Sequence, residues 1–134
     1  MKKERLRDIR YIYEEAEELK DKIIQFETMR TSPRNAVYGS ERVQSSTKGD
    51  VQASTIAMLD ALLQSYNAKL RECVRITMEF EQAITTLNER ERIIIRKHYL
   101  DGMTWSEIQD DMNMSERNLK RIGNRALKKI EQMA

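Results

Sequence analysis

The sequence predicts an all-α protein, and three properties of the chain support this. Charged residues make up 34% of the 134 residues and aromatic residues only 6%, a composition typical of long helices and not of sheets. Four glycines and one proline leave few positions that would interrupt a helix. Apolar residues also recur at alternating steps of three and four over long stretches, which is the spacing of one helix face.

Two long helices are predicted in the N-terminal part of the chain, over residues 3–29 and from about Asp50 to residue 87. In both, the apolar residues follow the heptad pattern of a coiled-coil seam. The first seam consists of Ile9, Ile12, Ala16, Leu19, Ile23 and Phe26. The second consists of Ile56, Leu59, Leu63, Tyr66, Leu70, Cys73, Thr77, Phe80, Ile84 and Leu87. We therefore expect residues 1–87 to form a coiled-coil-like antiparallel hairpin.

The two helices of this hairpin differ in length. At 1.5 Å per residue the second extends for roughly 50 Å and the first for roughly 40 Å. Part of the second seam therefore stays uncovered, which is unfavourable in water. This excess predicts a homodimer formed through the long helices.

Residues 31–50 form a polar segment rich in serine, threonine and glycine, which we interpret as the connection between the two helices. Pro33 disfavours helical conformation in the residue before it and so ends the first helix. Connections of this length without structure are uncommon and tend to be functional or disordered. Two interpretations stay open: a plain hairpin loop, or a segment that packs against or binds a partner.

Residues 88–134 are predicted to form three further helices. The first begins at Asn88, a favourable N-cap residue, and ends at Gly102, where glycine can adopt the left-handed conformation. The second begins at Thr104, because Thr104 and Glu107 have the spacing of a capping box. This second helix is short, since turn-forming residues follow within three turns.

The third helix follows a tight turn at Asn113, a residue type that tolerates positive φ, and Ser115 can cap it. Its apolar positions lie at steps of three and four, at Leu119, Ile122, Ala126, Ile130 and Met133. A short helix, a tight turn and a longer helix make a helix-turn-helix unit. The second helix of such a unit lies in the DNA major groove.

Charge is strongly segregated between these last two helices. From Ser115 to the end there are six bases and two acids: Arg117, Lys120, Arg121, Arg125, Lys128 and Lys129 against Glu116 and Glu131. Residues 101–111 contain four acids and no base. A basic surplus on the helix that would meet phosphate is expected of a protein that binds nucleic acid, although the whole chain has a net charge of only +2.

We predict that nine residues form the surface that binds double-stranded DNA. They are Ser115, Glu116, Arg117, Asn118, Lys120, Arg121, Asn124, Arg125 and Lys128. Those in the first turns of the helix are expected to contact base edges, arginine binding guanine and asparagine binding adenine. Those farther along, and the backbone amides at the start of the helix, are expected to contact phosphate.

Four stretches of this C-terminal part resemble region 4 of bacterial sigma factors, the region that recognises the −35 promoter element. They read LNERER at residues 87–92, YLDGMTWSEI at 99–108, MSERNL at 114–119 and RALKKI at 125–130. The resemblance covers about a third of the chain. It implies a sigma region 4 type of three-helix domain over residues 88–134, with Arg117, Lys120 and Arg121 at positions that the family uses to bind DNA.

Two positions depart from the pattern of that family. Gln109 stands where the family usually has an alanine packed against the recognition helix. Its amide must therefore turn toward solvent or find a polar partner. Asn113 replaces the usual glycine of the turn.

A second stretch, ERVQSS at residues 41–46, resembles small phage and prophage regulators that place such a domain after a helical hairpin. Those proteins are similar to late-gene transcription activators of the ArpU/RinA kind. The resemblance implies a promoter-binding protein of a bacterial host cell, located in the cytoplasm with the nucleoid. It also implies RNA polymerase as a second partner.

Enzyme and metal-site interpretations receive little support. Cys73 lies on the helical seam, where a small buried apolar role is expected, and it cannot form a four-ligand zinc site with the single histidine, His98. No glycine-rich phosphate loop and no G-x-S-x-G or H-E-x-x-H motif is present. We therefore expect no enzymatic activity, cofactor or metal. Trp105 is expected to pack in the core, and His98 to lie at the surface or against Tyr99.

Nothing in the sequence predicts association with a membrane. There is no apolar run near the roughly 18 residues that a spanning helix requires, and the first residues are charged, unlike a signal peptide. One cysteine cannot form an internal disulfide, which agrees with a reducing compartment. We expect a cytoplasmic protein.

Two other functions fit the same pattern. A DNA-binding structural adaptor, such as the small terminase subunit of a phage packaging motor, would also join a helix-turn-helix to a coiled helical core, and would form a ring. A sigma-like module that binds RNA polymerase without touching DNA is the other. The molecular mass in solution distinguishes the ring-forming adaptor from a regulator. The salt dependence of DNA binding distinguishes the polymerase-binding module from a regulator.

Overall fold

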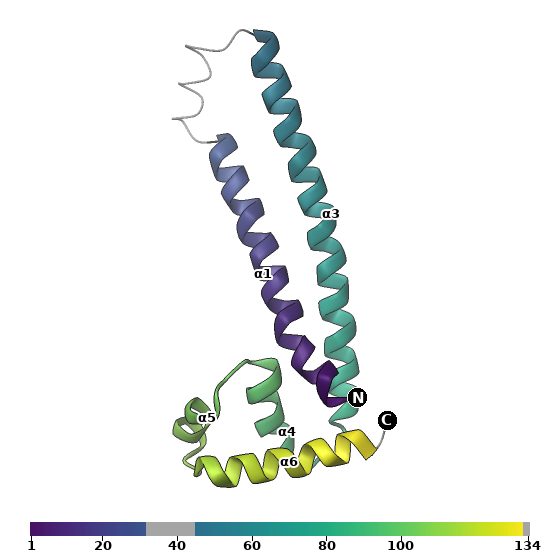
Figure 1. Cartoon of the computed structure of the whole chain (residues 1–134), viewed down its shortest axis with the longest axis vertical. Coiled ribbons are helices and arrows are strands. Elements are labelled where there is room, and N and C mark those ends of the chain that lie inside the picture. Colours follow the sequence, from purple (N-terminus) through teal and green to yellow (C-terminus); the bar gives the residue numbers. More distant parts are fainter. Residues whose placement is uncertain (32–44, 133–134) are drawn as a thin grey trace. The chain divides into compact units, whose positions relative to one another are not determined.

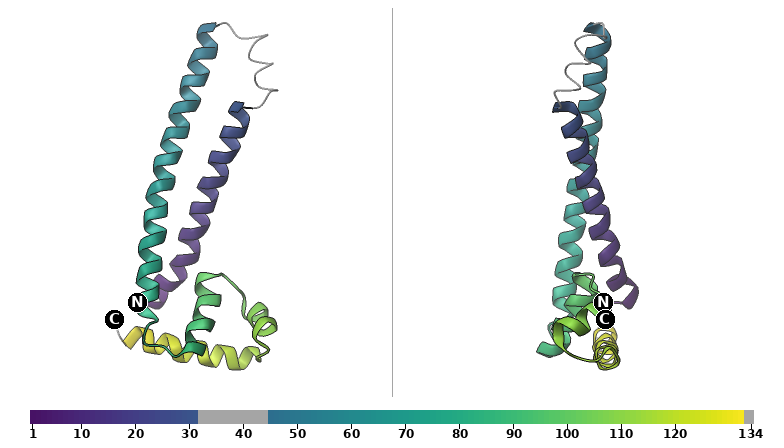
Figure 2. Two further views of the ribbon diagram at one scale, coloured as in Figure 1. Left: turned by 180° about the vertical axis from the view of Figure 1, so that it is seen from behind. Right: turned by 90° about the vertical axis from the view of Figure 1, so that its left-hand side faces the viewer.

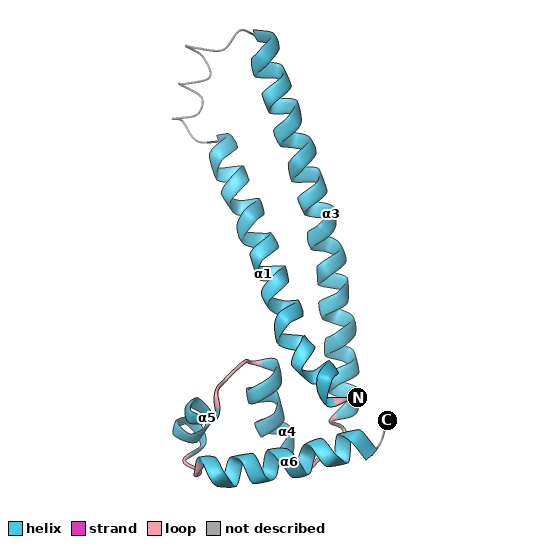
Figure 3. Ribbon diagram, in the orientation of Figure 1, coloured by secondary structure: helices cyan, strands magenta, loops and turns pink. Residues whose placement is uncertain are grey.

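The computed structural model describes residues 1–31 and 45–132, and side chains within the helix from residue 52 onward. Every regular element in these two ranges is a helix, which confirms the all-α fold (Figure 3). The elements are α1 (Lys3–Thr31), α3 (Ser45–Ala83), α4 (Glu89–Ile95), the π-helical turn η1 (Arg96–Leu100), α5 (Trp105–Met112) and α6 (Glu116–Gln132) (Figure 1). Of these helices, none combines the length and apolar character needed to cross a bilayer.

The two long helices are present as predicted, with differences at both ends of the second, which ends at Ala83 and not at residue 87. α3 begins at Ser45, five residues before the predicted start at Asp50, so part of the polar segment is helical. Residues 32–44, and with them most of the predicted connection and residues 41–44 of the ERVQSS stretch, lie outside the described residues. The chain divides into two compact units, Met1–Tyr13 with Glu72–Ala134, and Glu14–Arg71.

The first unit contains the larger core. In it, the start of α1 and the end of α3 pack together with α4, η1 and α6. Its buried members are Leu6, Ile9, Ile12, Ile76, Phe80, Ile84, Leu87, Ile95, Ala126, Leu127 and Ile130. The first and last helices of the chain therefore share one core. The domain division at residue 87 stays a prediction, and this core takes residues from both sides of it.

A second, smaller core joins α4, α5 and α6. It consists of Ile94, Ile108, Leu119 and Ile122, with Met103, Trp105, Met112 and Met114 partly buried around them. This cluster fixes the helix-turn-helix, because each of its three helices contributes at least one fully covered side chain.

The second unit, Glu14–Arg71, consists of parts of α1 and α3 that run antiparallel side by side (Figure 2). Ala16 and Leu59 are buried between them, and Lys69 Nζ pairs with Glu15 Oε2 at 2.7 Å. The other predicted seam positions of α1 in this unit are only half-buried. Much of the α3 seam stays uncovered, because Ile56, Leu63 and Leu70 are exposed although Leu59 between them is buried. These residues belong to the part of α3 that runs beside α1, so the difference in helix length does not account for their exposure.

Candidate nucleic-acid interface

The two helices of the helix-turn-helix begin at the predicted caps. Thr104 Oγ1 accepts a hydrogen bond from the Glu107 amide at 3.2 Å, and Ser115 Oγ accepts one from the Asn118 amide at 3.2 Å. Between them Asn113 adopts the left-handed conformation, with φ of 53°. Asparagine is one of the few residue types that tolerate this conformation, and it therefore replaces glycine at the turn.

The helix that precedes this unit also starts and ends where predicted. Asn88 Oδ1 accepts a hydrogen bond from the Glu91 amide at 2.9 Å, and Gly102 has a φ of +70°. The interior differs from the continuous α-helix that we predicted, because η1 forms a wider π-helical turn. Its carbonyl at Arg96 accepts from the Asp101 amide at 2.9 Å, five residues later.

The buried face of α6 matches the predicted periodicity and is wider than predicted. Leu119, Ile122, Ala126 and Ile130 are buried as expected, and Met133 lies outside the described residues. Gly123 and Leu127 are also buried, although the predicted apolar face did not include them. A helix packed against neighbours on two sides needs an apolar stripe broader than a single three-four row.

At Gly123 the side chain of Trp105 from α5 lies directly against the backbone of α6. A Cβ atom at this glycine would lie 2.8 Å from Cη2 of Trp105, so the indole ring occupies the space above the α6 backbone. Trp105 also stacks on His98, with ring centroids 4.0 Å apart, and the rings of His98 and Tyr99 are nearly perpendicular, with centroids 4.8 Å apart. Trp105 is thus part of the core, as predicted, and does not serve as an exposed stacking surface for bases.

Opposite this buried face, α6 exposes a cationic face. It consists of Arg117, Arg121, Asn124 and Lys128, at steps of four, three and four, all exposed. Arg125 is exposed beside them. Residues at this spacing lie in one row along a helix, so the row presents three positive charges and an amide on one side. The structure therefore brings together five of the nine predicted DNA-binding residues.

The remaining four predicted residues lie at the start or the edges of this face. Lys120 Nζ pairs with Glu116 Oε1 at 3.1 Å on one flank. Half-buried Asn118 accepts hydrogen bonds through Oδ1 from Arg121 Nε at 3.3 Å and Nη2 at 2.8 Å. Ser115 serves as the N-cap. Within the described part of the chain, no carboxylate forms an ion pair with Arg117, Arg125 or Lys128.

Lys129 is a basic residue of α6 with a structural contact instead. Its Nζ lies 2.7 Å from Oε1 of Glu91, whose side chain is only 2% exposed. The other carboxylate oxygen, Oε2, has no hydrogen-bond partner. Lys129 is one of the six bases after Ser115, and nothing in the pattern of charges along the sequence distinguishes it from Lys128.

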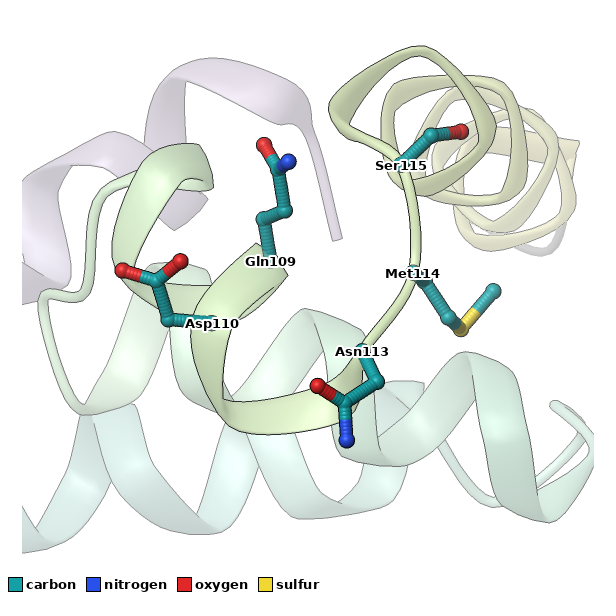
Figure 4. Close-up of a pocket in the computed structure, with 5 residues that line it drawn as sticks. All are labelled: Gln109, Asp110, Asn113, Met114 and Ser115. Carbon is teal, nitrogen blue, oxygen red and sulfur yellow. The ribbon is translucent and has the colours of Figure 1, made fainter.

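The turn between α5 and α6 forms a shallow hollow. Figure 4 shows the five residues that line it: Gln109, Asp110, Asn113, Met114 and Ser115. Gln109 is exposed, which confirms that its amide turns toward solvent where the sigma family has an alanine. The helix-turn-helix therefore accommodates this departure without burying a polar group.

Three side chains, those of His98, Tyr99 and Glu81, have pKa values shifted from their ordinary ones. The pKa of His98 is lowered, mainly by burial and to a smaller extent by the positive charge of Arg10. A hydrogen bond between Nδ1 and the Met103 carbonyl, 2.9 Å long, acts in the opposite direction and raises this pKa. Burial raises the pKa of Tyr99. The hydrogen bonds from Arg96 lower the pKa of Glu81 despite partial burial. Among the described residues, no group of three or more histidine, cysteine or acidic side chains could hold a metal ion.

Comparison with known proteins agrees with this geometry. Residues 77–130 match the family model "Sigma-70, region 4". The chain is similar to the RNA polymerase sigma factor TcsR of Paraclostridium sordellii, with 37% identity over 57 residues, 42% of this chain and 33% of the relative. A TcsR sequence from strain ATCC 9714 gives 38% identity over 55 residues, 41% of this chain and 32% of that protein.

The chain thus spans about a third of the length of these curated relatives. No solved structure matches the chain significantly. The matched residues include the end of α3, both helices of the helix-turn-helix and the cationic face. The C-terminal part of this chain is therefore a helix-turn-helix of the sigma-70 region 4 type.

Proposed function

We propose that this protein is a sequence-specific regulator of transcription that binds double-stranded promoter DNA through residues 115–133, most of which form α6. One observation carries the proposal: α6 buries one face completely and exposes the cationic face on the other. A helix held in this way can enter the major groove while the rest of the domain stays outside. The region 4 match over residues 77–130 supports this role.

Two kinds of contact are expected along α6. Arg117 and Arg121 lie in its first two turns, where a recognition helix meets base edges, and their guanidinium groups suit guanine. Asn118 orients Arg121 through its carbonyl oxygen, which leaves the amide nitrogen of Asn118 to face a base. Arg125 and Lys128 lie farther along the helix, where phosphate is the expected partner. The backbone amides at the start of α6, at Ser115 and Glu116, are also expected to bind phosphate.

RNA polymerase is the second proposed partner. The similar proteins of Paraclostridium sordellii are named RNA polymerase sigma factors, and the similarity lies in the segment that carries the helix-turn-helix. The resemblance to phage and prophage regulators supports a phage or prophage activator acting in the cytoplasm of a bacterial host. We further propose that residues 1–87 form a hairpin through which two copies associate, and that residues 88–134 form the DNA-binding domain.

The experiment that tests DNA binding uses the full chain. Its preferred duplex is selected from a random pool, and its affinity for that duplex is measured by fluorescence anisotropy between about 50 and 200 mM salt. We expect the logarithm of the binding constant to fall with a slope of about −0.9 for each phosphate contact. The proposal would be contradicted if the selection enriched no sequence, or if the affinity did not change with salt. Retained binding to RNA polymerase in that case would favour a polymerase-binding module.

A further inference from the structure

α3 carries a second apolar face in addition to the one that covers α1. Ile56, Leu63 and Leu70 recur at steps of seven and are 49%, 42% and 39% exposed. Asp60 and Asn67 fall between them, so the five positions alternate steps of four and three. We call this row the outer seam. All of it lies within the compact unit Glu14–Arg71.

The exposure of the outer seam has a simple geometrical cause. Leu59 is 4% exposed and lies on the face of α3 that meets α1, because α1 is the other helix in this unit. Ile56 and Leu63 are displaced from Leu59 by three and four residues, toward the side that α1 does not reach. A heptad row of large apolar side chains left in water is the signature of a helix that pairs with another helix.

We infer that the outer seam binds a second copy of this chain, with the two α3 helices antiparallel. This inference rests on the dimer included in the proposed function and assigns it a surface and an orientation. Two charges support this occupant: Asp60, a position of the seam, and Arg71, which borders it. Asp60 and Arg71 are both exposed, and neither forms an ion pair with another described residue. They lie eleven residues apart on the same edge of the seam.

Antiparallel pairing brings these two charges together. When two helices pair about a two-fold axis across their length, the same edge of each helix faces the other. With the axis near residue 65, Asp60 of each copy lies level with Arg71 of the partner subunit, and this happens twice. In a parallel dimer, eleven residues would separate the two charges by roughly 16 Å along the axis. The seam is therefore self-complementary only in the antiparallel arrangement.

Sedimentation equilibrium on the full chain tests the surface. The wild type is expected to be a dimer, and Leu63→Glu is expected to raise its dissociation constant by at least about tenfold, since the buried carboxylate loses water. Met58→Glu is the matched control, because Met58 is 51% exposed but lies on the opposite side of α3. It should leave the dissociation constant unchanged. Circular dichroism checks that both variants remain helical.

Charge exchange tests the orientation. Asp60→Arg and Arg71→Asp should each weaken the dimer several-fold by placing like charges side by side. The double variant should restore the wild-type dissociation constant only if the helices are antiparallel. The inference would be overturned if the wild type were a monomer or a ring of eight or more chains. It would also be overturned if the two glutamate variants had equal effects, or if the double variant dimerised no more tightly than the single ones.

These outcomes are independent of DNA binding. A dimer with the expected variant pattern that binds no duplex would contradict the proposed function and support the inference. A monomer that binds its selected duplex with steep salt dependence would do the reverse.

Discussion

Lys128 and Lys129 are neighbours in the sequence and have different environments on α6. Lys128 lies in the cationic face, where the described residues offer it no carboxylate. Lys129 holds the buried carboxylate of Glu91, one oxygen of which is already without a partner. A buried charge that loses its counterion is unfavourable, so the two lysines should respond differently to removal of their charge.

Lys129→Met should lower the free energy of unfolding by about 1–3 kcal/mol, a range kept modest because Lys129 is itself partly exposed. Lys128→Met, the matched control, should change it by less than about 0.5 kcal/mol. Urea denaturation of the two variants measures both values. Equal destabilisation by the two changes would show that the contact with Glu91 contributes nothing.

Arg121 is the residue of the cationic face with the most defined geometry. Arg121→Ala should weaken binding to the selected duplex by about 1–3 kcal/mol and relax the preference at one base pair. Lys22→Ala removes an exposed charge on α1, far from α6 in the sequence, and serves as the control in the same anisotropy assay. If the two variants lose equal affinity, Arg121 does not contact a base.

His98 gives the fold a defined dependence on pH. Its pKa is lowered in the folded state from the ordinary value of 6.5, so below that value the unfolded chain binds more protons. The stabilisation is complete above about pH 6.5 and decreases as the pH falls toward the folded pKa. We expect the melting temperature to fall between about pH 7 and 5, and His98→Gln to flatten this slope. An unchanged slope in the variant would exclude His98 as the cause.

At the scale of the elements, the contact between α5 and α6 depends on the absence of a side chain at Gly123. Gly123→Ala would place a methyl group against the Trp105 ring, which is held by its stack on His98. Displacing the ring should cost about 1–3 kcal/mol of unfolding free energy, in excess of the gain in helix propensity. Asn124→Ala, at the adjacent exposed position, should change stability little.

This variant also separates folding from binding. Gly123 itself faces away from the cationic face, so any loss of DNA affinity in Gly123→Ala must come from movement of α5 relative to α6. A variant as stable as the wild type would mean that the indole moves without cost. Thermal denaturation followed by circular dichroism gives the answer for both substitutions.

The caps and helix ends could be predicted because local chemistry determines them. Asn88, Thr104 and Ser115 each accept the hydrogen bond that their residue type favours at an N-cap, and Asn113 and Gly102 take the positive φ that theirs allow. The π-helical turn η1 could not be predicted, since α- and π-helical turns accept the same residue types. The structure, and not the sequence, shows which hydrogen-bond ladder forms there.

The candidate site also has some features that could be predicted from the sequence and others that could not. The positions of Arg117, Arg121 and Lys128 on one exposed face follow from helical periodicity once the buried residues are known. The contact of Lys129 with Glu91 and the approach of Trp105 to Gly123 could not be predicted. Both depend on how separate helices pack, which periodicity along one helix does not contain.

At the scale of the whole molecule, the two compact units should differ in local stability. The unit Met1–Tyr13 with Glu72–Ala134 holds almost all of the buried apolar residues, whereas Glu14–Arg71 buries only Ala16 and Leu59 among its described apolar side chains. Segments with few buried contacts open more often. Hydrogen exchange should therefore be faster at the amides of residues 56–66 than at those of 76–84.

The difference in hydrogen exchange between these two segments should also depend on protein concentration. Association through the outer seam would protect residues 56–66 more at high protein concentration than at low, because binding stabilises the associated state. Exchange in 76–84 should remain nearly constant and serves as the internal reference. Equal exchange rates in the two segments would contradict the unequal distribution of the core.

The shared core of the first and last helices has a consequence for how the protein is made. Leu6 and Ile130 belong to the same buried cluster, although nearly the whole chain separates them. The ribosome releases residue 130 long after residue 6, so this cluster cannot close before α6 has been synthesised. The long helices can form earlier, but the core that supports the cationic face of α6 is assembled only after α6 has left the ribosome.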